Sequence, residues 1–163
     1  MHAPEKIEPR DLSDYLAVMS RAALEPGLNW SVVESKWPGI VDAFDGFDVL
    51  RVAACSPVDV DRLMGDPRVI RNRRKIEAIV RNAGEMLALD GPGGGFRAYL
   101  RSFGSYETLV KDLKKRFSFL GDSGAYHFLY SVGEQVPVWE EWVDTHPGVA
   151  RGQMGAPGVT VGT

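Results

Sequence analysis

The stretch SYETLVKDLKKRFSFLGDSGAYHFLYSVG, residues 105–133, decides the fold. Its first half repeats apolar residues at helical spacing and ends in Lys114, Lys115 and Arg116, the pattern of a basic amphipathic helix. A short turn with a glycine follows, and a second helical pattern begins at once. A turn glycine lets the backbone approach a partner closely, and the first amides of a helix can bind a phosphate. The stretch predicts a helix-hairpin-helix, although many helical hairpins with a glycine turn bind nothing.

Helical spacing of apolar residues extends over most of the remaining chain. The predicted helical segments are 11–24, 29–44, 48–54, 57–65, 72–89, 96–103, 105–117 and 123–132. Pro38 should kink the second of them, and the glycine-rich run 91–95 should be a flexible loop. No segment alternates with period two for long enough to predict a strand. We therefore expect an all-α fold, a compact helical bundle of about eight short helices.

Length and composition set further bounds. A chain of 163 residues with 44% hydrophobic residues can bury a core, and we expect residues 1–147 to form a single domain. Residues 148–163 lack the apolar content to pack and should form a flexible tail. Cys55 is the single cysteine, which excludes an internal disulfide and predicts a reducing, cytoplasmic setting. No apolar run approaches the length of a membrane span, and the first ten residues do not form a secretory signal.

The positive charges are concentrated in the middle of the chain, although the formal net charge is −3. Residues 68–116 carry twelve basic and five acidic side chains, whereas the segments before and after them are both acidic. The positive charges form two clusters. The first consists of Arg68, Arg71, Arg73, Arg74, Lys75 and Arg81, and the second, near the end of the helix predicted over 105–117, of Lys111, Lys114, Lys115 and Arg116. Such clusters are typical of a phosphate-binding face, and the alternative is an ordinary solvated helix surface.

Three stretches resemble blocks of the DNA-3-methyladenine glycosylase I family. They are GLNWSVVESKWPGIVDAFDGFD at 27–48, DVDRLMGDPRVIRNRRKIEAIVRNA at 59–83 and LKKRFSFLGDSGAYHFLYSVG at 113–133. They occur in the family's order, and the resemblance spans roughly residues 12–142. It implies an all-helical glycosylase of the helix-hairpin-helix superfamily, which cleaves the N-glycosidic bond of an alkylated purine in DNA. Such an enzyme must rotate the nucleotide out of the duplex to reach the base.

The resemblance also implies roles for single residues around the extruded base. Trp30 matches the family's stacking tryptophan. The family's base-reading glutamate falls on Ala22, so Glu25, one helical turn further, is the first candidate for the catalytic carboxyl. Glu140, in the segment after the hairpin, is the second candidate. His127 falls where the family has a small polar pocket residue, and Tyr126 and Tyr130 flank it.

For DNA binding, the resemblance implies backbone contacts from the hairpin and charged contacts from both basic clusters. The candidates are Phe119, Leu120, Gly121, Asp122, Ser123 and Gly124 in the hairpin, with Lys114, Lys115, Arg73, Arg74 and Lys75 beside it. The partner should be double-stranded DNA that contains an alkylated base.

Departures from the family's pattern set the remaining expectations. The family's zinc-binding Cys and His residues have no counterpart here, so we expect no metal and no cofactor. The position of the superfamily's Schiff-base lysine falls near Asp122 or Ser123, and no lysine stands there. This predicts a monofunctional enzyme without a lyase step. We expect a monomer without a membrane partner. Because the family glutamate is missing, two alternatives stay open: a module that binds DNA or a damaged base without cutting, and a protein-interaction domain that uses the basic face.

Overall fold

The computed structural model describes residues 6–147, and this part of the chain contains nine α-helices and no strand. Their bounds are α1 (Leu12–Leu24), α2 (Trp30–Ala43), α3 (Val49–Ala53), α4 (Pro57–Met64), α5 (Arg73–Asp90), α6 (Phe96–Leu100), α7 (Tyr106–Arg116), α8 (Asp122–Ser131) and α9 (Trp139–Asp144). Short 3-10 turns at Asp45–Phe47 and Pro92–Gly94 connect some of them. The all-α prediction is confirmed. The tail expected over 148–163 lies outside the described residues.

Local capping explains why several predicted helices begin where they do. Asn29 accepts a hydrogen bond from the Ser31 amide at 2.9 Å and starts α2. Ser56 and Asp59 bond each other's backbone amides, which starts α4. The Asn72 side chain accepts from the Lys75 amide at the start of α5, and Ser105 and Thr108 bond each other's backbone amides at the start of α7. Each signal lies within four residues of the helix it starts, so it could be recognised in the sequence.

The structure differs from the predicted segments in three places. Helix α9 was not predicted, and its N-cap residue, Val138, provides no capping side chain that would mark its start. Helix α6 ends at Leu100, short of the predicted residue 103. Residues 91–95, predicted as a flexible loop, include a 3-10 turn that leads to the start of α6, where Asp90 accepts a hydrogen bond from the Phe96 amide at 3.0 Å.

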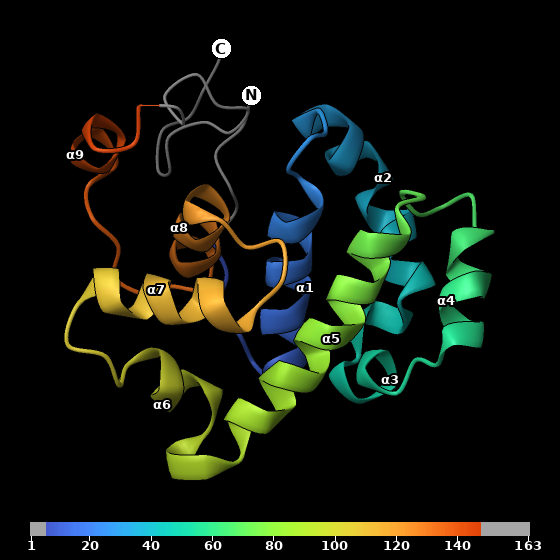
Figure 1. The fold of residues 1–163 in the computed structure, drawn as a ribbon, viewed down its shortest axis with the longest axis horizontal. Helices are drawn as coiled ribbons and strands as arrows, with labels where there is room; N and C mark the ends of the chain where they lie inside the picture. Colours follow the sequence, from blue (N-terminus) through green and yellow to red (C-terminus); the bar gives the residue numbers. More distant parts are fainter. Residues whose placement is uncertain (1–5, 148–163) are drawn as a thin grey trace.

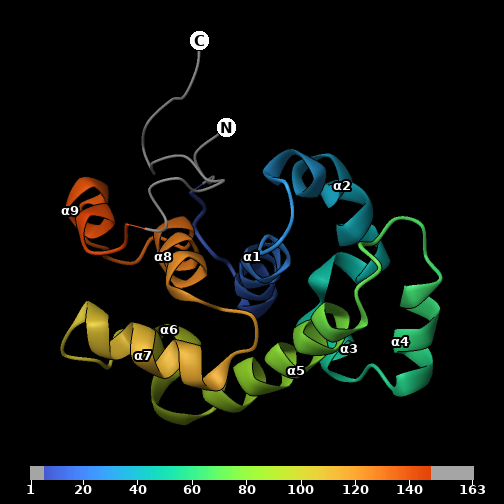
Figure 2. The same ribbon diagram turned by 45° about the horizontal axis from the view of Figure 1, so that its top comes forward.

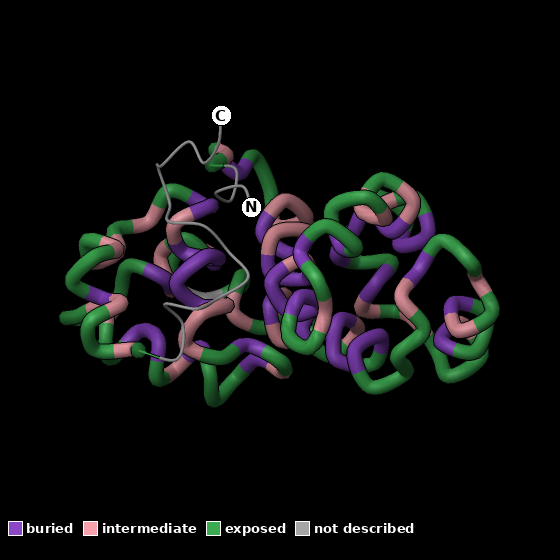
Figure 3. The backbone as a smooth tube through the Cα atoms, turned by 90° about the horizontal axis from the view of Figure 1, so that it is seen from above, coloured by how far each residue is buried: buried purple, intermediate pink, exposed green. Residues whose placement is uncertain are grey.

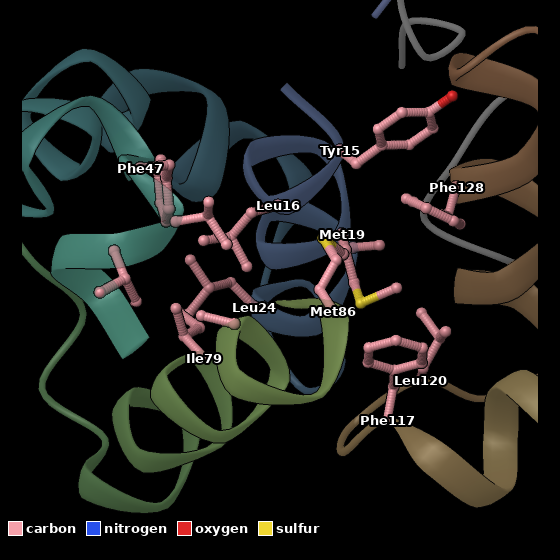
Figure 4. Close-up of a cluster of buried hydrophobic side chains, with 14 of the residues drawn as sticks. Tyr15, Leu16, Met19, Leu24, Phe47, Ile79, Met86, Phe117, Leu120 and Phe128 are labelled. Atoms are coloured by element: carbon pink, nitrogen blue, oxygen red, sulfur yellow. The ribbon is translucent and has the colours of Figure 1, made fainter. Parts of the chain in front are cut away.

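Helix α1 lies at the centre of the molecule and divides it into two sides. In two views, α8 lies on one side of α1 and α2 on the other, while α5 runs diagonally past α1 (Figure 1, Figure 2). Buried positions along these helices lie mostly toward the interior of the molecule, and exposed positions lie mostly on its outside (Figure 3). The apolar core, which includes Leu16, Met19, Ile79, Met86 and Phe128, joins both sides across α1 (Figure 4). None of the helices in the described part is long and apolar enough to cross a membrane.

The connection between α7 and α8 is a tight hairpin that α5 holds in place. Asn82 of α5 accepts a hydrogen bond from the Ser118 amide at 2.8 Å and donates to the Ser118 carbonyl at 3.1 Å. Phe119 adopts φ of 58°, a left-handed conformation that is rare for a bulky residue, and its side chain is partly exposed. The sequence predicted this helix-hairpin-helix, and the structure contains two helices joined in this way.

Candidate functional site

A cavity of about 210 Å³ lies between α1, α2 and α8, beside the hairpin. Residues from all three helices form its wall, together with Ile7 of the segment before α1, whose amide bonds the Ser131 carbonyl at 2.7 Å. The polar or aromatic side chains on this wall are Asp14, Arg21, Glu25, Trp30, Trp37, His127, Phe128 and Ser131. Three predicted site residues, Glu25, Trp30 and His127, therefore meet in one place.

Glu25 is the C-terminal cap of α1, and its side chain is almost fully buried. Burial raises the pKa of its carboxyl to about 8, and the nearby Arg21 opposes the rise only in part. Its Oε2 atom is buried and has no hydrogen-bond partner in the described structure. At neutral pH the carboxyl is therefore mostly protonated and can donate a hydrogen bond to a ligand in the cavity.

Lys75 holds the turn that carries Glu25. Its ammonium group is buried, donates to the Leu24 carbonyl at 2.8 Å and also bonds the Pro26 carbonyl. Burial lowers the pKa of Lys75. This corrects the prediction that Lys75 contacts DNA. Its ammonium group points into the protein and donates hydrogen bonds to the two carbonyls. The orientation of Lys75 could not be predicted from the basic residues next to it, because its bonding partners, Leu24 and Pro26, are distant in sequence.

Trp30, the first residue of α2, is nearly buried and lines the cavity with its indole. Its Nε1 atom has no acceptor among the described residues. Trp37 follows two helical turns later on the same helix and also lines the cavity. The guanidinium carbon of Arg21 lies 4.9 Å from the Trp30 ring centre and 5.3 Å from the Trp37 ring centre. Two indoles therefore flank one cation at the cavity wall.

His127 connects the cavity to the hairpin. Its ring is buried, and its Nδ1 atom lies 2.9 Å from the Ser123 carbonyl, which can only accept, so the hydrogen sits on Nδ1. Ser123 belongs to the first turn of α8, directly after the hairpin. Ala22 lies on the cavity wall where α1 and α8 approach closely, since a Cβ added to Gly124 would lie 3.9 Å from the Ala22 Cβ.

Three predicted residues do not line this cavity, which corrects their expected placement. Tyr126 is buried against Trp139 and Trp142, and its hydroxyl donates to the Pro137 carbonyl at 2.7 Å. Burial, with the nearby charge of Glu140, raises the pKa of Tyr126 to about 12. Tyr130 is half-buried with the Lys6 ammonium over its ring, and Glu140 is exposed on α9. One residue step turns a helical side chain by about 100°, so His127 faces the cavity and Tyr126 does not.

The predicted DNA contacts lie on the hairpin, at the end of α7 and at the start of α5, and their surroundings differ. Lys114 pairs with Asp122 at 2.7 Å, and Arg73 pairs with Asp61. Arg74 and Lys115 are exposed. The Leu120 side chain is buried, so this residue can offer DNA only its backbone. Gly121 precedes α8, and a Cβ added there would meet open space, which leaves the amides of the first turn accessible from that side.

Sequence reasoning missed Arg21, Trp37 and Asp14 on the cavity wall. Helical spacing could have found the first two, because Arg21 lies four residues before Glu25 and Trp37 lies seven after Trp30. Asp14 lies seven residues before Arg21 on the same face of α1.

A helical scaffold that carries a base-sized cavity beside a hairpin with open amides has the form of a DNA glycosylase that extrudes its base. The profile of the methyladenine glycosylase family matches residues 8–115. DNA-3-methyladenine glycosylase of Haemophilus influenzae is 32% identical over 130 residues, which cover 67% of this chain and 70% of the relative. DNA-3-methyladenine glycosylase 1 of Escherichia coli has the same identity and coverage. The chain belongs to the methyladenine glycosylase family.

Solved structures agree with this assignment. A structure of 3-methyladenine DNA glycosylase I from Staphylococcus aureus, solved for 3-methyladenine recognition, superposes with a TM-score of 0.70 at 26% identity, over 80% of each chain. A solution structure of a 3-methyladenine DNA glycosylase I gives a TM-score of 0.65 at 29% identity, over 81% of this chain and 80% of the other. The family resemblance in the sequence is confirmed.

Proposed function

We propose that this protein is a monofunctional DNA glycosylase that removes an alkylated purine from double-stranded DNA by base flipping. The observation that carries the proposal is the meeting of Glu25, Trp30 and His127 in one cavity beside the hairpin. The family membership and the 3-methyladenine glycosylase relatives support it. The charge pattern supports DNA as the partner, since exposed cations such as Arg74 and Lys115 can neutralise phosphates.

In this mechanism the hairpin amides at Gly121, Asp122, Ser123 and Gly124 hold a phosphate, and the flipped base enters the cavity. The Trp30 indole stacks on the base, which offsets unstacking, since base–aromatic stacking contributes about 1–3 kcal/mol. The protonated Glu25 carboxyl hydrogen-bonds a nitrogen of the base and stabilises it as it departs. Water then adds to C1′ of the sugar and loses a proton. No residue forms a covalent bond to DNA.

The direct test is release of free base from methylated duplex DNA, detected by chromatography. The wild-type protein should release 3-methyladenine, and Glu25→Gln should slow release by about tenfold, because the amide is a weaker hydrogen-bond donor to the base than the carboxyl. Glu34→Gln, which changes an exposed carboxyl on the neighbouring α2, is the matched control and should not slow it. Undiminished release by Glu25→Gln would show that Glu25 is not the catalytic carboxyl.

A second candidate function, a module that binds damaged DNA without cutting, is favoured by one observation. Ala22 occupies the wall position where the resemblance places the family's glutamate, so the usual carboxyl is missing there. Binding of methylated duplex without any base release, at enzyme in excess over DNA, would support this module and overturn the glycosylase.

A further inference from the structure

Arg21 covers the aromatic face on which the proposed function places the extruded base. Its guanidinium carbon lies 4.9 Å from the centre of the Trp30 ring and 5.3 Å from the centre of the Trp37 ring. Trp30 is only 9% exposed, and all three residues line the same cavity. A base can therefore stack on this side of the Trp30 indole only after the guanidinium has left it.

The guanidinium is held over the indoles weakly. Within residues 6–147 Arg21 forms no salt bridge, and its buried Nε atom has no hydrogen-bond acceptor. A cation–π contact changes an equilibrium by a factor of about 2–30. The indoles are held more firmly, because both belong to α2 and Trp37 also stacks on Phe47, at 5.4 Å between ring centres. The long side chain of Arg21 is therefore the part of this group that can move.

Asp14 offers the displaced guanidinium a counter-charge. It lies on the cavity wall two helical turns before Arg21 on the same face of α1, and helical side chains lean toward the N-terminus of their helix. Its carboxylate accepts from the Arg10 amide at 2.9 Å and pairs with the Arg10 side chain at 3.5 Å. The Arg10 side chain is 88% exposed, so this pair contributes little and leaves the Asp14 charge available to a second cation.

We propose that Arg21 is a place-holder for the base: its guanidinium covers Trp30 in the free protein, and an entering alkylated purine displaces it toward Asp14. This inference rests on the proposed function and adds a displacement step to it. An N3-alkylpurine, which is cationic in DNA, suits the exchange, because one planar cation replaces another on the indole. Asp14 then offsets the charge of the guanidinium that has left.

Nuclear magnetic resonance of the wild-type protein tests the displacement directly, with the free base 3-methyladenine as the probe. The indole rings should shift the Arg21 Cδ protons upfield in the free protein, and the signal is assigned by its loss in Arg21→Ala. Saturating 3-methyladenine should move this signal downfield into the range of exposed arginines such as Arg51. An Arg21 signal that stays upfield while the base is bound would overturn the inference.

Affinities measured in the same titrations give a second test. Arg21→Ala uncovers the indole and should bind 3-methyladenine about 3–30-fold more tightly than the wild type, the factor that the lost cation–π contact represents. The control, Arg51→Ala, changes an exposed arginine on α3 and should keep the wild-type affinity. Equal or weaker binding by Arg21→Ala would overturn the inference. The titrations are run at pH 6.5, where Glu25 keeps its proton because burial raises its pKa to about 8.

A double-mutant cycle tests the path toward Asp14. Asp14→Asn should weaken binding of 3-methyladenine about threefold in the wild-type background, because the displaced guanidinium loses its counter-charge. The same substitution should have no effect in Arg21→Ala, which has no guanidinium to displace. An equal effect in both backgrounds would show that Asp14 does not receive Arg21 and would overturn this part of the inference.

Base excision from methylated duplex DNA separates failure of the inference from failure of the proposed function. If the wild type releases 3-methyladenine but the Arg21 signal does not move and Arg21→Ala binds no more tightly, the inference fails and the glycosylase stands. If the signal moves and Arg21→Ala binds more tightly while no base is released from DNA, the proposed function fails and the place-holder is supported.

Discussion

Replacing Glu25 with glutamine should remove a pH-dependent loss of stability. In the unfolded chain this carboxyl ionises near its ordinary pKa of 4.5, whereas burial raises the pKa in the folded protein to about 8. The folded state therefore holds the proton over a range in which the unfolded state has released it, so stability falls as pH rises through that range. Below about pH 4.5 the group has no effect, and above about pH 8 the loss is constant.

The size of the effect follows from the two pKa values. Each unit of difference corresponds to about 1.4 kcal/mol, so this carboxyl alone should lower the free energy of unfolding by about 3 kcal/mol between about pH 5 and pH 8. Glutamine has nearly the same shape and does not ionise. The difference between Glu25→Gln and the wild type should therefore grow by about 3 kcal/mol over this range, in favour of the variant.

Urea unfolding followed by tryptophan fluorescence, at several pH values, measures this difference. Subtracting the variant's free energy of unfolding from that of the wild type at each pH cancels the contributions of groups that titrate alike in both proteins. Glu34→Gln, at an exposed carboxyl of α2, should follow the wild-type curve. Parallel curves for wild type and Glu25→Gln would refute the reasoning, since they would mean that the carboxyl ionises in the folded protein as easily as in the unfolded chain.

Three further substitutions test the supports of the site. Lys75→Met leaves the Leu24 and Pro26 carbonyls without their shared donor and should lower the free energy of unfolding by about 2–4 kcal/mol and slow base release. Unchanged urea unfolding would show that Lys75 does not hold the turn. Gly121→Arg fills open space beside the hairpin and should weaken DNA binding about tenfold in fluorescence anisotropy, whereas Gly104→Arg should not; equal losses would contradict a hairpin contact. Asn82→Ala removes both bonds to Ser118 and should destabilise the protein by about 2–3 kcal/mol; hydrogen exchange should then speed up in the hairpin, and unaltered exchange would argue against this anchor.

The family blocks and the helix starts could be recognised from sequence because their signals are local. Asn29, Ser56 and Ser105 each cap a helix through an amide at most three residues away. The hairpin could be predicted for the same reason, since a basic helix, a glycine turn and a second helix follow one another without a gap. Helix α9 was missed, and its N-cap residue, Val138, has no side chain that could cap it.

The sequence by itself determined an all-helical chain of this family, and it singled out Glu25, Trp30 and His127. Only the tertiary structure decided that these three share one cavity, because they come from α1, α2 and α8, and packing around α1 brings the helices together. Packing also turned Lys75 inward, placed Tyr126 on another face of α8, and set Arg21 between two indoles. Which way a side chain points depends on the neighbouring helix it meets, and that neighbour is distant in sequence.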